Sequence, residues 1–125
     1  TLHANNPRDA LGRMENMVCM AGFDMPVKNI RAQIASAINV VIQLQRHEDG
    51  CRRITSVQEI NGMEGDIITM SEIFKFERSG KDANGNVKGS YKATGVIPNF
   101  NKQLKLKGID LPNAVYGVDF NIANF

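Results

Sequence analysis

The spacing of apolar residues predicts two helices near the start of the chain. Asn6 is a favourable N-cap and Pro7 suits the first helical turn. Apolar positions then recur at helical spacing as far as Gly22, and they are Leu11, Met14, Val18 and Ala21. A second helix is predicted between Pro26 and Asn39, with an apolar face of Val27, Ile30, Ile34, Ala37 and Ile38. We interpret the methionines of the first helix as core residues, and they are Met14, Met17 and Met20.

The pattern changes from helical to strand-like at Val40. Residues 40–46 alternate after a short apolar start, and the turn residues 48–50 then predict a hairpin. The returning strand, 51–60, does not alternate strictly, because its apolar residues Ile54, Val57 and Ile60 are three positions apart. We therefore expect a bulge or bend near Thr55-Ser56.

Shorter elements are predicted for the rest of the chain. Strands are expected at 66–69 and 73–77, separated by a turn at Ser71-Glu72, and again at 87–93 after a polar loop at 80–85. A short helix is predicted from 98 to 108, with Phe100, Leu104 and Leu106 facing inward. The apolar residues of the tail are Leu111, Val115, Tyr116, Val118 and Phe120.

Composition narrows the class of protein. The chain has 125 residues, 42% of them hydrophobic and 22% charged, which suits one small folded domain. Two cysteines exclude a disulfide scaffold, and no apolar run approaches the ~18 residues of a membrane span. The chain opens at Thr1 without an initiator Met, so we expect it to be a fragment.

Charge gives no sign of a nucleic-acid partner. Fifteen Lys and Arg residues nearly balance 13 Asp and Glu residues, for a formal net charge of +2. The most concentrated basic group is Lys102, Lys105 and Lys107, which we interpret as a solvated helix face.

Several motifs are absent or incomplete. The only Gly-Lys pair, Gly80-Lys81, is followed by Asp82, so no phosphate-binding loop is present. Residues 82–86 lack the closing Glu of a calcium loop and are interpreted as a hairpin turn. No metal site is expected, because Cys19 and Cys51 have no partner motif; we expect Cys19 to be packed and Cys51 to lie near the surface.

The two histidines invite different interpretations. His47, beside the predicted hairpin turn, is interpreted as a solvated residue. His3 leads directly into a helix N-terminus, where backbone N–H groups favour anions. It could hydrogen-bond a phosphate oxygen or orient a water molecule, or it could be an ordinary loop histidine.

Four segments in order resemble one family. Residues 1–13 resemble the His box of secretion ATPases, more specifically the CpaF-type ATPases of Flp (tight-adherence) pilus assembly. Residues 30–38 resemble the following helix, 52–66 the next signature, and 89–98 with Phe100 the end of such proteins. The resemblance covers nearly the whole chain and is weakest after Gly117.

This resemblance implies a fold class and a division of the chain. The chain would be an α+β fragment of a RecA-like α/β P-loop ATPase domain, with two N-terminal helices, antiparallel hairpins and a short C-terminal helix. Residues 1–60 would belong to the ATPase core, and 61–125 to a β-rich appendage. The Walker A loop, Asp box and Walker B carboxylate that hold ATP and Mg²⁺ lie upstream in the family. The fragment alone is therefore expected to be inactive and to bind no cofactor.

The resemblance also implies a cellular role. Family members are hexamers on the cytoplasmic face of the bacterial inner membrane. They couple ATP hydrolysis to pilus assembly or secretion through integral membrane platform proteins. An alternative is a free-standing module that contacts such proteins without nucleotide. In the fragment we expect self-association or domain swapping, because Met14, Val18, Ile30 and Ile34 would lose the sheet on which they pack.

Few residues acquire a role from the resemblance. His3 matches the His-box histidine, whose role is to sense or orient the γ-phosphate. Arg13 matches an arginine assigned to coupling between motor elements. Thr1 would end a core strand and could polarise the nucleotide site through its hydroxyl. Arg8 and Asp9 fit the family pattern, although helix capping and surface pairing explain them equally well.

Overall fold

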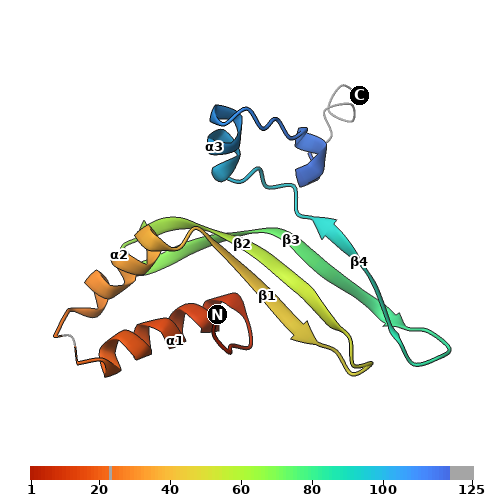
Figure 1. Cartoon of the computed structure of the whole chain (residues 1–125), viewed down its shortest axis with the longest axis horizontal. Coiled ribbons are helices and arrows are strands. Elements are labelled where there is room, and N and C mark those ends of the chain that lie inside the picture. The colour runs from red at the N-terminus through yellow and green to blue at the C-terminus, as the bar shows by residue number, and fades with distance from the viewer. Residues whose placement is uncertain (23, 119–125) are drawn as a thin grey trace.

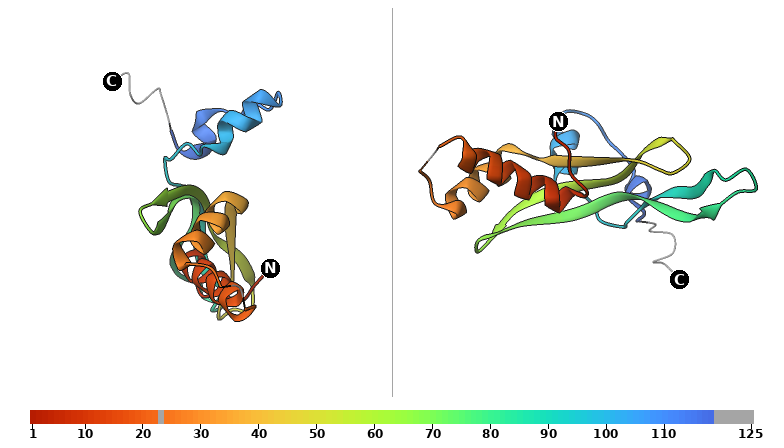
Figure 2. Two further views of the ribbon diagram at one scale, coloured as in Figure 1. Left: turned by 90° about the vertical axis from the view of Figure 1, so that its left-hand side faces the viewer. Right: turned by 90° about the horizontal axis from the view of Figure 1, so that it is seen from below.

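The computed structural model describes residues 1–22 and 24–118. Its helices are α1 (Pro7–Met20), α2 (Val27–Ala37), α3 (Phe100–Leu106) and the 3-10 helix η1 (Asn113–Tyr116). Its strands are β1 (Val40–Arg46), β2 (Arg52–Glu64), β3 (Ile67–Lys81) and β4 (Val87–Ala93). The strands form an antiparallel sheet in the order β1-β2-β3-β4. Helices α1 and α2 lie on one side of this sheet, and α3 with η1 lies on the other (Figures 1 and 2).

The predicted start of the first helix is confirmed in detail. The Asn6 side chain accepts a hydrogen bond of 2.8 Å from the Asp9 N–H, and the Asp9 carboxylate accepts one of 3.0 Å from the Asn5 N–H. These contacts satisfy backbone donors that a helix N-terminus would otherwise leave without partners. The methionine prediction is wrong for two of the three residues. Met17 and Met20 are exposed, and Met14 packs against the core because it alone faces α2 and the sheet.

The main core lies between the two N-terminal helices and the sheet. Its buried members are Leu11, Ile30, Ile34, Ile60 and Ile68. The apolar face predicted for the second helix is thus confirmed at Ile30 and Ile34. The expectation that Ile30 and Ile34 would be exposed in the fragment is wrong, because β2 and β3 of this same chain cover them.

The first hairpin closely follows the predicted strands. β1 has the predicted bounds, and its register with β2 shifts between Gln43 and Leu44, which face Ser56 and Ile54. Thr55 is therefore the extra residue of a bulge, as the three-residue spacing of apolar positions predicted. Residue 60 lies inside β2, which continues without a break to Glu64.

The prediction of a turn at Ser71-Glu72 is wrong. β3 is one strand across this region, with Ser71 opposite Glu59 and Glu72 opposite Gln58. The Ser56 hydroxyl donates a 2.6 Å hydrogen bond to the Glu72 carboxylate, and the Asn61 amide donates one of 2.6 Å to the Ser71 hydroxyl. Partners on β2 therefore satisfy both polar residues that resemble a turn in sequence.

The second hairpin depends on two sharply defined positions. Asp82 Oδ1 accepts 2.9 Å hydrogen bonds from the N–H groups of Asn84 and Asn86, which confirms the predicted hairpin turn. Within β4, a Cβ atom at Gly89 would lie 2.4 Å from the Phe76 ring and 2.6 Å from the Glu77 carbonyl oxygen. Only glycine therefore fits beneath Phe76 at this position.

The segment after β4 is fastened to the sheet by a buried carboxylate. Glu59 on β2 accepts hydrogen bonds of 2.8 Å from the N–H groups of Asn99 and Phe100 at the start of α3. The buried Tyr116 donates a 3.0 Å hydrogen bond to the side chain of Asn101. Burial raises the pKa of the Tyr116 hydroxyl.

The predicted inward face of the last helix needs correction. Leu106 is 88% exposed, because the helix turns its Asn101 side toward the sheet instead. In the predicted tail, Tyr116 is buried and Val115 is exposed, whereas Phe120 lies outside the described residues. Among the described helices, none has the length and hydrophobicity needed to cross a membrane.

Candidate functional site

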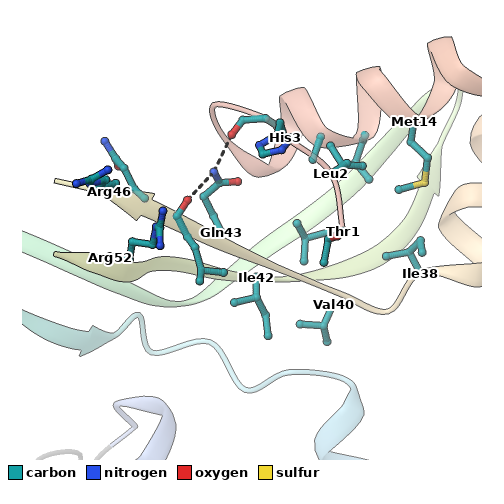
Figure 3. A pocket seen from close by; sticks show the side chains of 16 residues that line it. Thr1, Leu2, His3, Met14, Ile38, Val40, Ile42, Gln43, Arg46 and Arg52 are labelled. Atoms are coloured by element: carbon teal, nitrogen blue, oxygen red, sulfur yellow. Dashed lines mark hydrogen bonds between the residues drawn. The ribbon is translucent and has the colours of Figure 1, made fainter. Parts of the chain in front are cut away.

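A pocket of about 500 Å³ lies beside β1. Its walls are the first four residues of the chain, one side of α1 around Ala10 to Met14, and the whole of β1, with Arg52 from β2 at one end. Figure 3 shows His3 and Leu2 above β1, and Arg46 and Arg52 together at the left end. The pocket therefore lies between the segment that resembles the His box and the first hairpin.

A glutamine positions the first residues of the chain over β1. Gln43 Nε2 donates a 2.9 Å hydrogen bond to the carbonyl oxygen of Ala4 (Figure 3). This contact fixes the segment just before the helix N-terminus, so the exposed His3 side chain is held at the pocket wall. Sequence reasoning missed Gln43, because its partner is a backbone atom 39 residues away.

The structure separates the three candidate site residues predicted from the sequence, which are Thr1, His3 and Arg13. Thr1 and His3 line the same pocket. Arg13 does not line it; its Nε donates a 3.1 Å hydrogen bond to the Asp9 carboxylate on the exposed side of α1. The hydrogen bond from the Asn5 N–H, followed by that from Arg13, lowers the pKa of Asp9. Asp9 thus takes part in both capping and pairing, whereas Arg8 donates a 2.6 Å hydrogen bond to the Ile68 carbonyl oxygen of β3.

The arginines of the chain fall into two groups. Five of them donate hydrogen bonds to acceptors within the described residues, namely Arg8, Arg13, Arg31, Arg53 and Arg78. Arg46 and Arg52 have no ion pair or side-chain hydrogen bond with any described residue. They are directly opposite each other in the β1–β2 register, and both line the pocket.

The tip of the same hairpin is closed by a polar network. Both Arg53 guanidinium nitrogens donate to Asp49, at 2.9 and 3.2 Å, and the Asp49 carboxylate also accepts from the N–H groups of Cys51 and Val87. Arg53, followed by the backbone donors, lowers the pKa of Asp49. Because Val87 begins β4, these bonds join the first hairpin to the second.

His47 belongs to this network, and the expectation that it is solvated is wrong. It is buried, with its ring 5.6 Å from that of Phe76 and its Nδ1 atom 3.0 Å from Arg53 Nη1. Arg53 can only donate, so the Nδ1 atom of His47 is the acceptor of this hydrogen bond. The guanidinium group of Arg53 also lies over the Phe76 ring, 5.7 Å from the centroid.

A second ion pair ties the turn to β3. Glu48 binds Arg78 through both guanidinium nitrogens, and Lys81 lies 3.4 Å away. The hydrogen bond from Arg78 is the largest of the effects that lower the pKa of Glu48 to about 2. Both acidic residues of the turn are therefore engaged by cations other than Arg46 and Arg52.

β1 leaves apolar surface uncovered. Among the described strands it pairs only with β2, and Ile42 and Leu44 are 53% and 57% exposed. Between Val40 and Gln45 it has neither a proline nor a charged residue, the usual devices that protect an edge strand. The pocket therefore lies against a strand edge that can accept a further strand.

The described residues contain no group of three or more His, Cys, Asp or Glu side chains arranged to hold a metal ion. Both cysteines are exposed and reduced. The expectation that Cys19 is packed is wrong, since Cys19 is exposed and does not belong to the core between the helices and the sheet.

Comparison with known proteins gives a partial match. The chain is 32% identical over 65 residues to the "Putative conjugal transfer protein MT3759" of Mycobacterium tuberculosis (strain CDC 1551 / Oshkosh). It matches "Putative conjugal transfer protein Rv3659c" of strain ATCC 25618 / H37Rv to the same extent. The match covers 52% of this chain and 18% of each relative, so the chain spans less than a fifth of their length. No family model matches the chain.

Proposed function

We propose that this chain is the C-terminal part of the RecA-like motor domain of a hexameric, CpaF-type ATPase. The whole protein would couple ATP hydrolysis to Flp-type pilus assembly or protein secretion. It would work at the cytoplasmic face of the bacterial inner membrane, through integral membrane platform proteins. The conjugal transfer proteins that the chain resembles support a role in a secretion-related system.

The pocket beside β1 is the observation on which this proposal rests. Residues 1–4, α1 and β1 line this pocket together, and the Gln43–Ala4 hydrogen bond joins the first residues to β1. β1 exposes Ile42 and Leu44 and has a free edge among the described strands. A parallel core sheet continued by strands outside this chain would cover that edge and place His3 at the sheet's margin.

The lining residues fit part of an ATP site. His3, Arg46 and Arg52 suit phosphate oxygens, and none of the described lining residues is a carboxylate. Mg-ATP would supply the phosphoryl group, and the ligands of its Mg²⁺ would come from outside this chain. His3 would donate a hydrogen bond to the γ-phosphate, Thr1 would offer its hydroxyl, and Arg13 would couple motor elements from outside the pocket. The chain alone would therefore not hydrolyse ATP.

Substitution of His3 in the intact parent protein tests this role. We expect His3→Ala to lower ATP turnover strongly, because an interaction with the transferring phosphoryl group is lost, while the thermal midpoint stays unchanged. Met20→Ala, at the exposed far end of α1, is the control that should preserve turnover. Unchanged turnover in His3→Ala would remove His3 from the mechanism.

A second candidate function is a nucleotide-independent module that contacts platform proteins. The exposed aliphatic residues of β1 favour it, since an uncovered strand edge recruits partners. The coding sequence upstream of Thr1 separates the two proposals: Walker A and Walker B motifs in frame support the ATPase, and a start codon immediately before Thr1 supports the module. Micromolar binding of labelled Mg-ATP by the chain alone would contradict our assignment of the ATP site.

Self-association of the fragment is part of this proposal, now assigned to the β1 edge. Sedimentation should show a concentration-dependent dimer or higher species, because Ile42 and Leu44 would be buried between copies. A clean monomer at high concentration would contradict it.

A further inference from the structure

The two unpaired arginines of the first hairpin lie where a pair of like charges is unfavourable. Arg46 and Arg52 are opposite each other in the register, so their side chains leave the same face of the hairpin. Directly opposed like charges destabilise a strand pair. A bound anion between them would turn that repulsion into two attractive contacts.

Nearby acidic residues do not neutralise this pair. Glu48 binds Arg78 and Lys81, and Asp49 binds Arg53 and two backbone N–H groups. Arg53 follows Arg52 in sequence but extends toward the opposite face, where its charge is matched. The carboxylates of the hairpin turn are thus paired with other cations, and the guanidinium groups of Arg46 and Arg52 stay exposed at the pocket.

We infer that Arg46 and Arg52 form a phosphate-binding clamp that recognises the polyphosphate chain of a nucleotide. The planar guanidinium group donates two parallel hydrogen bonds to phosphate oxygens, a geometry that lysine lacks. Two such groups on neighbouring strands can hold successive phosphates. This inference deepens the proposed function, since the clamp lines the same pocket as His3.

The pocket gives Arg46 and Arg52 two features that a pair of arginines on an open surface would lack. Its volume of about 500 Å³ is within the range of small-ligand sites. The hydrogen bond from Gln43 holds residues 1–4, which form another wall of the same pocket (Figure 3).

Nuclear magnetic resonance on the ¹⁵N-labelled chain tests the clamp directly. Tripolyphosphate is added to the wild-type chain and to the double variant Arg46→Gln/Arg52→Gln. The charge-matched control is Lys102→Gln/Lys105→Gln, which removes two positive charges from α3. We expect millimolar binding by the wild type and the control, with shifts at residues 46 and 52. Affinity should fall at least about tenfold in the arginine variant, equivalent to about 1.4 kcal/mol.

Further variants separate shape from charge. Arg46→Lys/Arg52→Lys keeps the charge and should recover only part of the affinity, because the bidentate geometry is lost. ATP should compete with tripolyphosphate for the same residues. Equal binding by the glutamine variant, or equal weakening in the lysine control, would overturn the clamp. Binding of a DNA oligonucleotide through these arginines without binding of tripolyphosphate would also overturn it.

The outcomes for the clamp and for the proposed function differ. If residues 46 and 52 respond to tripolyphosphate while His3→Ala leaves parent turnover unchanged, the clamp stands and the assigned role of His3 fails. If His3→Ala abolishes turnover while the arginine double variant binds tripolyphosphate normally, the ATPase proposal stands and the clamp fails.

Discussion

Arg52 and Arg53 are neighbours in sequence, yet they belong to two regions with opposite properties. Arg53 belongs to the hairpin tip, where it pairs with Asp49, whose side chain is only 1% exposed. It also donates a hydrogen bond to the buried His47. Arg52 joins the pocket, where it and Arg46 have no partner among the described residues. Because successive side chains of a strand point to opposite faces, Arg53 lies in a network of paired charges, whereas Arg52 lies at the open pocket.

This difference separates groups that stabilise the fold from groups available for function. In the tip network, Asp49 accepts from Arg53 and from two backbone N–H groups, and Arg53 also donates to His47, so changes there should lower stability. Arg46 and Arg52 at the pocket make no ion pair or side-chain hydrogen bond with the described residues, so changes to them should leave stability intact and alter binding. The same contrast holds for apolar residues, since the helix-covered side of the sheet is closed and the outer side of β1 is open.

The largest expected effect concerns apolar residues, which are buried on the helix-covered side of the sheet and exposed on the outer side of β1. Ile30 is 2% exposed in the core between α2 and the sheet. Replacing it with alanine should lower the free energy of unfolding by about 2–5 kcal/mol, because apolar contacts are lost and a cavity remains. The measurement is chemical denaturation, in which the m-value should be the same for the wild type and the variant.

Ile42→Ala is the matched control, since Ile42 is the same residue type on the open side of β1. Its free energy of unfolding should change by no more than about 0.5 kcal/mol. Comparable losses in both variants would mean that the outer side of β1 is covered in solution.

The next effect concerns the hairpin tip. Asp49→Ala leaves Arg53 without its bidentate partner and removes the acceptor of two backbone N–H groups. We expect the thermal midpoint to fall by several degrees, whereas Arg52→Ala should leave it nearly unchanged. A midpoint as high as that of the wild type would show that the network contributes nothing to stability.

A smaller effect is expected where Glu59 holds the segment after β4. Glu59→Gln keeps the shape but turns an amide NH₂ toward one of the two backbone donors, Asn99 or Phe100. The cost should be roughly 1–3 kcal/mol. Hydrogen exchange should accelerate first in α3 and η1, while α1 and β1 keep their protection. Uniform acceleration throughout the chain would contradict this local role.

Local sequence patterns predicted the elements because their signals are themselves local. Helical spacing located both N-terminal helices, and a three-residue apolar spacing located the bulge at Thr55. The turn expected at Ser71-Glu72 fails because both polar side chains find partners on β2: Glu72 accepts from Ser56, 16 residues away, and Ser71 accepts from Asn61. Burial of His47 likewise depends on Phe76, which periodicity cannot reveal.

The candidate site was only half predictable for the same reason. The helix start at Pro7 identified His3, since capping residues and anion-favouring backbone donors lie within one short segment. Arg46 and Arg52 could have been recognised from their equal distance on either side of the turn at Asp49, which predicts a cross-strand pair. Gln43 could not, because its hydrogen bond requires the first residues to fold back over β1.

The smallest expected effect is the pH dependence of the hairpin tip. The pKa of Glu48 is lowered from 4.5 to about 2 by Arg78, and that of Asp49 is also lowered. Their stabilisation is therefore fully present above pH 4.5 and is lost as pH falls toward 2. Thermal midpoints measured across this interval should fall more steeply for the wild type than for Glu48→Gln.

Salt distinguishes the two carboxylates within that interval. The Glu48–Arg78 pair is well exposed, so its contribution should fade as ionic strength rises, whereas the enclosed Asp49–Arg53 pair should be less affected. At high salt, the acid loss that remains should disappear in Asp49→Asn and persist in Glu48→Gln. Arg46→Gln/Arg52→Gln should leave the acid profile unchanged, since neither arginine is paired with Glu48 or Asp49. A profile altered by that double variant would mean that the tip and the pocket are one electrostatic unit, which would remove the separation that the arginine clamp requires.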